Sequence, residues 1–191
     1  AMKFQAQLKT FGFDMDIAEA RRVIKIYREA NWKINKLWRD AQQALVALSR
    51  KEEASLGLAG VLKVMPQESA IRLPSGLLLR YDDLGFDTTD KGTEFHYRVR
   101  RGRNRIYGGK VIENVCQALA RIVIGEQLLR VAKKYKVAMT VHDAIGCIVP
   151  EAEEQTGKEF VEMVMKVRPT WAQDLPLDCE AFTGDSYGGC K

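Results

Sequence analysis

The sequence lacks the segments that would anchor or export a protein. None of its apolar runs approaches the roughly 20 residues of a membrane-spanning helix. Its N-terminal residues contain no apolar signal region, so no membrane partner is expected. No internal repeat or flexible linker is visible either. The 191 residues, 46% hydrophobic and 29% charged, are typical of a soluble globular protein with one domain and room for a subdomain.

Side chains that bind zinc are also scarce. The sequence has only two histidines and four cysteines, and no two cysteines form a CxxC pair. A zinc site is therefore not expected. Cys116, Cys147 and Cys179 lie in apolar stretches, which predicts small buried side chains in a reducing compartment.

Positive charge is modest overall but concentrated in one stretch. The formal net charge is +5. The basic residues of this stretch are Arg98, Arg100, Arg101, Arg103, Arg105 and Lys110. One interpretation is a solvated hairpin turn, because charge runs are commonly solvated. The other is a patch that contacts phosphate groups.

The first 50 residues predict helices. Residues 3–11 place apolar side chains on one helical face. Asp16 is placed to cap a second helix, with Glu19 as its capping-box partner. The helical pattern then continues to about Arg50, with a kink or a break at residues 31–32.

The rest of the chain predicts strands and helices in succession. The expected order is a hairpin of residues 71–73 and 77–81, a polar loop over 82–91, a strand over 94–100, a turn over 101–104, a helix over 109–134, a hairpin around 142–143, a helix from 150, a last strand over 175–182 and a glycine-rich tail over 184–191. Four polar side chains in the helix over 109–134 recur at spacings of 4, 3 and 4 and form one stripe, namely Lys110, Asn114, Gln117 and Arg121. Taken alone, this stripe favours an ordinary solvent-facing side.

The pair His142-Asp143 lies between two apolar runs. Residues 137–139 precede it and residues 145–150 follow it, which predicts two short strands with a carboxylate at the tip. A carboxylate held by regular backbone on both sides suits a Mg²⁺ ligand in phosphoryl transfer. The pair is a weak motif alone, and the motifs around it decide its meaning.

Several further motifs carry a family resemblance. They are Phe4-Gln5-Ala6 through to Tyr27, Leu73-Pro74-Ser75-Gly76 before Tyr81, Tyr107-Gly108-Gly109-Lys110 leading into Asn114 and Gln117, Val141-His142-Asp143, and Leu175-Pro176-Leu177 before Glu180. In this order and spacing, the chain resembles the C-terminal end of the family A (polymerase I-like) DNA polymerases, most closely those of bacteriophages. The resemblance implies an α+β fold with an antiparallel palm sheet that carries the His-Asp hairpin and is packed by long helices, as part of a right-hand polymerase. Residues 1–50 would then be the helical remainder of the fingers, and residues 51–191 the C-terminal part of the palm.

The resemblance also implies roles for the site residues. Asp143 would ligate the catalytic Mg²⁺ ions, and His142 would lie beside the primer terminus. Gln117 would contact the minor groove of the template–primer, with Lys110, Asn114 and Arg121 as neighbours. The arginine-rich stretch would hold the duplex backbone. The implied partners are template–primer DNA and a deoxynucleoside triphosphate, and the implied location is the cytoplasm, that of the host cell if a phage encodes the chain.

Departures from the family qualify this interpretation. Ala144 stands where the family often has Glu, and Ile122 where it usually has Asp. The family's Asp-Tyr-Ser-Gln-like strand and its nucleotide-binding helix have no counterpart here. Two-metal transfer needs more than one carboxylate and a cationic contact with the triphosphate. We therefore expect a C-terminal piece of a polymerase, from a split gene or by excision, that acts with a companion segment.

Two other functions stay open. The chain could be a catalytically inactive remnant that binds duplex DNA through the arginine stretch and the helix of Gln117. A nuclease or other metal-dependent phosphotransferase is the third alternative. Against this third alternative, the sequence has no local carboxylate cluster, because the acidic run Glu151, Glu153 and Glu154 fits a helix start instead.

Overall fold

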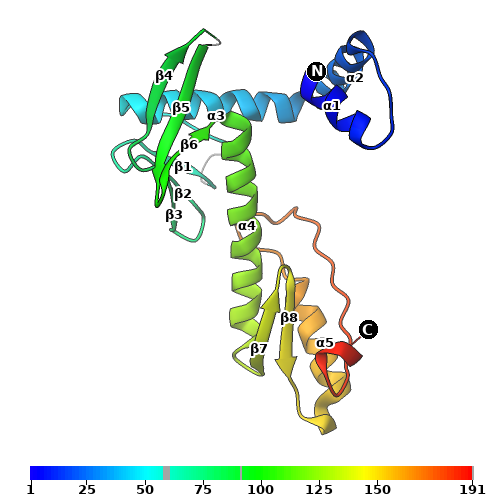
Figure 1. Ribbon diagram of the computed structural model, residues 1–191. Helices are drawn as coiled ribbons and strands as arrows, with labels where there is room; N and C mark the ends of the chain where they lie inside the picture. Colours follow the sequence, from blue (N-terminus) through cyan, green and yellow to red (C-terminus); the bar gives the residue numbers. More distant parts are fainter. Residues whose placement is uncertain (58–60, 91, 191) are drawn as a thin grey trace. The chain divides into compact units, whose positions relative to one another are not determined.

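The computed structural model describes residues 1–57, 61–90 and 92–190 (Figure 1). Lys91 and Lys191, the ends of the predicted polar loop and of the tail, lie outside the described residues. The chain divides into two compact units. Unit 1 comprises residues 1–71 and 80–113, and unit 2 comprises residues 72–79 and 114–191.

Unit 1 begins with three helices, α1 (Met2–Thr10), α2 (Ile17–Ala30) and α3 (Trp32–Arg50). The predicted cap is confirmed, because the Asp16 carboxylate accepts a 2.8 Å hydrogen bond from the Glu19 backbone N–H. The predicted break is confirmed as well. Asn31 ends α2 with a φ of −105° and a ψ of 43°, outside the helical range, and α3 starts at the next residue.

Helix α3 carries the buried side of the helical part. Ala41, Ala44, Leu45 and Leu48 are almost fully buried. Their spacing of three and four residues puts them on one face of the helix. This face positions α3 against the rest of unit 1, while residues of its first turns, such as Trp32, remain exposed.

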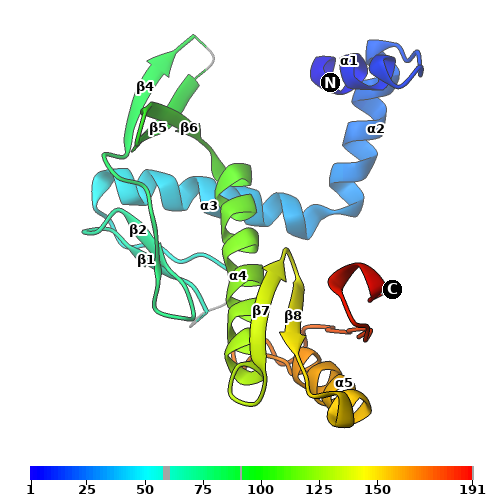
Figure 2. The ribbon, with the colours of Figure 1, turned by 60° about the horizontal axis from the view of Figure 1, so that its bottom comes forward.

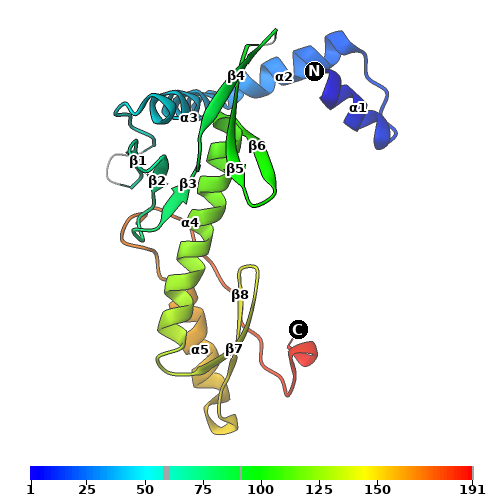
Figure 3. The ribbon, with the colours of Figure 1, turned by 60° about the vertical axis from the view of Figure 1, so that its left-hand side comes forward.

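Two small three-stranded sheets follow. The first has the order β1 (Lys63–Met65), β2 (Ala70–Arg72) and β3 (Leu78–Arg80), so the predicted strands near 71–73 and 77–81 are adjacent. The second is an antiparallel meander of β4 (Gly85–Thr89), β5 (Gly92–Val99) and β6 (Gly102–Ile106). Figure 3 shows these three strands side by side.

Two sequence-based expectations about the meander are wrong. The stretch predicted as a polar loop contains β4, which pairs with β5 from Gly85 opposite His96 to Thr89 opposite Gly92. Its polar residues are exposed, so no apolar alternation marks the strand. The turn predicted over 101–104 is Arg100-Arg101, because Val99 is already opposite Gly102.

Unit 2 is built around most of helix α4 (Gly108–Val131), the hairpin of β7 (Lys136–Val141) and β8 (Ala144–Ile148), and helix α5 (Glu154–Met165), which the 3-10 turn η1 (Glu151–Glu153) precedes. Figure 2 shows the hairpin alongside α4. A core cluster joins these elements, in which Val131 of α4 and Val161 and Val164 of α5 are buried. Gln127 belongs to the same region and donates a hydrogen bond to the Met165 carbonyl.

The predicted strand over 175–182 is wrong. This segment has no regular secondary structure, and the last element is the short 3-10 turn η2 (Tyr187–Gly189). Pro176 cannot donate a backbone hydrogen bond to a sheet. Side chains attach the segment instead, because Glu162 accepts a 3.1 Å hydrogen bond from the Ala181 N–H and Lys166 pairs with Asp178 at 3.0 Å.

One predicted core cysteine is also misplaced. Cys116 is exposed on α4, since Val111, Val115 and Ile122 occupy the buried side of that helix. Cys147 and Cys179 are half-buried and pack against the unit 2 core. Burial raises the pKa of both thiols above the usual range.

Candidate functional site

The turn between β7 and β8 consists of His142 and Asp143. Val141 is the Cα partner of Ala144, so these two residues alone connect the strands. His142 has a φ of 52°, a left-handed conformation that histidine adopts more readily than most residues. Both side chains are exposed. The turn therefore presents a carboxylate and an imidazole to solvent at the end of a paired backbone.

Packing at its base holds the hairpin in place. Val137, Ile145 and Cys147 pack against the core cluster of α4 and α5. Gly146 allows the strands to pack closely, because an added Cβ would lie 2.8 Å from the Met139 Cγ across the pair. The carboxylate of Asp143 is thus carried by strands whose inner side chains are anchored.

A β-bulge interrupts β7 between Val137 and Met139. Before the bulge, Val137 is opposite Cys147. After it, Met139 is opposite Gly146 and Thr140 is opposite the packed Ile145, a position that Met139 would take in a regular pairing. A bulge adds one residue to one strand and so reverses the faces that follow. Met139 and Val141, which follow the bulge, are both 39% exposed.

The described residues do not make a metal centre by themselves. Nowhere among them do three or more His, Cys, Asp or Glu side chains gather in a way that could hold a metal ion. Asp143 offers one exposed carboxylate, with the exposed His142 beside it. A two-metal site that used Asp143 would need further carboxylates from elsewhere.

The predicted polar stripe lies on a single helix, α4. Lys110 and Arg121 are separated by about 16 Å along it, at about 1.5 Å per residue. Gln117 and Arg121 are exposed, and Asn114 is half-buried. Lys110 donates a 2.7 Å hydrogen bond to Glu113, and this contact raises the pKa of Lys110. The pair offsets the charge of Lys110, so Gln117 and Arg121 are the members most available to a ligand.

The five arginines of the basic stretch belong to β5, β6 and the turn between them. We call these two strands and their turn the arginine hairpin. Arg98 is the Cα partner of Arg103, so two cations share one face. Arg98 pairs with Asp83 at 2.6 Å, and Arg105 with Glu94 at 2.9 Å.

Three arginines of this hairpin have no ion-pair partner among the described residues. Over the described ranges, ion pairs engage Arg98 and Arg105 but not Arg100, Arg101 or Arg103. All three are exposed. Like charges directly opposite each other in a sheet are destabilising. A cluster of this kind is suited to an anionic ligand.

The structure groups the predicted site residues into three sets. His142 and Asp143 share one turn, the stripe from Lys110 to Arg121 shares one helix, and the five arginines share one hairpin. The arginine hairpin belongs to unit 1, whereas Gln117 and Asp143 belong to unit 2.

Sequence reasoning missed a hollow in unit 1. Arg28, Trp32 and Arg39 line it together with Tyr107 and Gly108. These residues come from α2, α3 and the start of α4, so only the fold brings them together. In the sequence, the available signal was only that Arg28 and Trp32 lie four residues apart.

Comparison with known proteins gives one informative result. No protein-family model matches the sequence, and no solved structure matches it. None of the helices in the described part is long and apolar enough to cross a membrane. A curated DNA polymerase of Bacillus phage SP02 is 31% identical over 194 aligned residues, which cover 95% of this chain and 30% of that protein. The chain spans about a third of the length of this relative and, over nearly all its own length, is similar to a phage DNA polymerase.

Proposed function

We propose that this chain is the C-terminal segment of a DNA-directed DNA polymerase of the phage type of family A, with residues 1–50 as the remainder of the fingers and residues 51–191 as part of the palm. In this proposal Asp143 supplies one carboxylate to the Mg²⁺ site, and a companion segment supplies the second carboxylate and the nucleotide-binding helix. The substrates are template–primer DNA and deoxynucleoside triphosphates. The observation that carries the proposal is the similarity to a phage DNA polymerase across 95% of the chain.

The geometry of the hairpin agrees with this role. Phosphoryl transfer is catalysed mainly by positioning and by electrostatic stabilisation, so its carboxylates must be held in place. Asp143 lies in a two-residue turn above strands whose base packs on α4 and α5. Gln117 offers an amide that can hydrogen-bond the minor-groove acceptors present on every base pair, which suits contact without sequence preference.

A companion segment also has a surface to contact. Near the tip of the hairpin, Met139 and Val141 are 39% exposed, and at its base Ile148, opposite Lys136, is 58% exposed. Among the described residues the sheet consists of two strands, so each has an unpaired edge. Apolar side chains beside an open edge favour association with another strand or chain.

The direct test is primer extension. We expect the chain alone to extend a primer far more slowly than the chain mixed with the preceding part of a similar phage polymerase. That part must carry an Asp-Tyr-Ser-Gln-like strand and should also be inactive alone. Extension by this chain alone at the rate of an intact polymerase would contradict the need for a companion. No extension by the mixture, although the two segments form a complex, would contradict the polymerase assignment.

The arginine hairpin gives a separate prediction for duplex binding. Each phosphate contact contributes about 0.9 to the slope of log K against log salt. Replacing Arg100, Arg101 and Arg103 together by Gln should therefore flatten that slope by up to about 2.7, because among the described residues these three cations have no ion pair to break. Arg50→Gln, which removes an exposed arginine at the end of α3, is the control and should leave the slope unchanged. Fluorescence anisotropy of a labelled duplex at several salt concentrations measures the slope for both variants.

A catalytically inactive duplex-binding remnant is the second candidate. It is favoured by the single carboxylate at the hairpin tip and by Ala144, where the resembling family often has Glu. This candidate predicts duplex binding through the arginine hairpin with no extension under any combination of segments. The two candidate functions therefore predict different results for primer extension and the same result for duplex binding.

A further inference from the structure

We propose that the hollow of unit 1 binds single-stranded DNA, with bases stacked on Trp32 and Tyr107 and phosphates held by Arg28 and Arg39. This site differs from the duplex contacts proposed for the arginine hairpin and Gln117. It rests on the proposed function only for identifying the strand as the unpaired template.

Two exposed aromatic rings border this hollow. Trp32 is 59% exposed at the start of α3, and Tyr107 is 61% exposed just before α4. Lone exposed aromatic side chains are common, but two in one hollow provide flat surfaces for bases. Stacking on such rings tolerates any sequence, because every base has a π-face.

The charge of the hollow is complementary to phosphate. Arg28 and Arg39 line it and, within the described part of the chain, form no ion pair. Glu29 is the acidic residue of the lining, and Lys25 lies 3.8 Å from its carboxylate. Cations beside exposed aromatic rings are the combination that single-strand binding proteins use.

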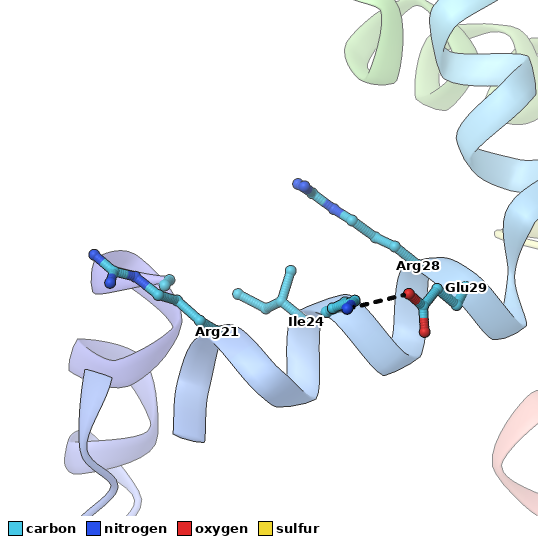
Figure 4. A pocket seen from close by; sticks show the side chains of 6 residues that line it. Arg21, Ile24, Arg28 and Glu29 are labelled. Atoms are coloured by element: carbon cyan, nitrogen blue, oxygen red, sulfur yellow. Dashed lines mark ion pairs between the residues drawn. The ribbon is translucent and has the colours of Figure 1, made fainter. Parts of the chain in front are cut away.

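Helix α2 extends this cationic surface. Arg21, Ile24 and Arg28 line a second hollow along the helix, and their side chains project from the same side of α2 (Figure 4). Arg28 borders both hollows. Arg21 and Arg28 are about 10 Å apart along the helix axis, at about 1.5 Å per residue. A strand whose bases stack at Trp32 can therefore continue with its phosphates along α2.

Hydrogen bonds hold the elbow between α2 and α3 in place. The Asn35 side chain donates a 2.6 Å hydrogen bond to the Arg28 carbonyl, and the Asn31 side chain donates one of 2.9 Å to the Tyr27 carbonyl. On the opposite side, Gln42 accepts a 2.7 Å hydrogen bond from the Gly108 N–H next to Tyr107. The two rings are thus carried by backbone that is fixed on both sides.

The test measures the binding of a labelled oligo(dT) to the whole chain by fluorescence anisotropy. Trp32→Ala and Tyr107→Ala should each weaken binding by between about fivefold and about a hundredfold, the usual contribution of one stacked base. Trp32→Phe should retain most of the affinity. Phe13→Ala, which removes a 66% exposed ring outside the hollow, is the matched control and should have no effect.

Salt dependence provides the second readout. Arg28→Gln with Arg39→Gln should flatten the slope of log K against log salt by about 0.7 for each phosphate that the variant no longer binds. Absence of oligo(dT) binding, an equal decrease in affinity with Phe13→Ala, or tighter binding of oligo(U) than of oligo(dT) would overturn the proposal. Retained oligo(dT) binding by a chain that supports no primer extension would leave this site in place and remove only the polymerase assignment.

Discussion

Replacing Asp143 by Ala should abolish primer extension by the chain and its companion while DNA binding is retained. The side chain is exposed at the hairpin tip, so the variant should fold normally. Metal ligation supports transition-state stabilisation of several kcal/mol. At about 1.4 kcal/mol per tenfold, removal of one such ligand predicts a decrease on the order of a thousandfold or more. Single-turnover extension with pre-bound DNA measures the chemical step.

Asp174→Ala is the control for this variant. Asp174 is also an exposed acidic residue in a turn of unit 2, and its replacement should leave extension unchanged. Unchanged extension by the Asp143 variant would remove this residue from the mechanism. Loss of DNA binding together with extension would assign Asp143 to binding rather than to chemistry.

Replacing Gly108 by Ala should strongly destabilise unit 1. An added Cβ would lie 2.1 Å from the Trp38 carbonyl oxygen and 2.8 Å from the Gln42 backbone N. Both are backbone atoms of α3 and cannot move aside like a flexible side chain. The start of α4 must then separate from α3 and break the hydrogen bond from Gly108 to Gln42. We expect the free energy of unfolding to decrease by about 3 kcal/mol, which is at the upper end of the cost of overpacking. Urea denaturation would show this decrease as a lower midpoint.

Two other glycines of α4 provide matched controls. Gly125→Ala places a Cβ in open space within the helix and should stabilise the protein by about 0.5–1 kcal/mol. Gly109→Ala meets the Tyr107 ring at 3.1 Å, which can shift, so a smaller destabilisation is expected than at Gly108. Equal urea midpoints for the Gly108 and Gly125 variants would contradict the close contact between α3 and α4.

Local signals predicted the helical part well. Asp16 and Glu19 mark the start of α2, and the residues around Asn31 mark its end, because caps and breaks depend on neighbours in sequence. Helix α4 was also predictable, since its apolar residues recur over many turns. In a long helix the apolar pattern repeats over enough turns that a single residue out of pattern does not change the prediction.

Non-local structure was harder to predict. Strand β4 exists because it pairs with β5, and its own exposed residues give no alternation. The segment over 175–182 has the apolar residues of a strand, but instead of pairing with a strand it is held by side chains of Glu162 and Lys166 and by the packing of Cys179. The hollow around Trp32 depends on residues from α2, α3 and α4, so the sequence could not show which aromatic and basic side chains meet.

The β-bulge in β7 separates two kinds of constraint within one strand. Before it, Val137 faces the core of unit 2, so substitutions there act on folding. After it, Met139 and Val141 face outward, so substitutions there leave the core intact and act on whatever covers the tip. In a regular pairing, with Ala138 opposite Gly146, Met139 would lie opposite Ile145 and share the face of Val137. The single extra residue thus lets the base of the hairpin and its tip evolve independently.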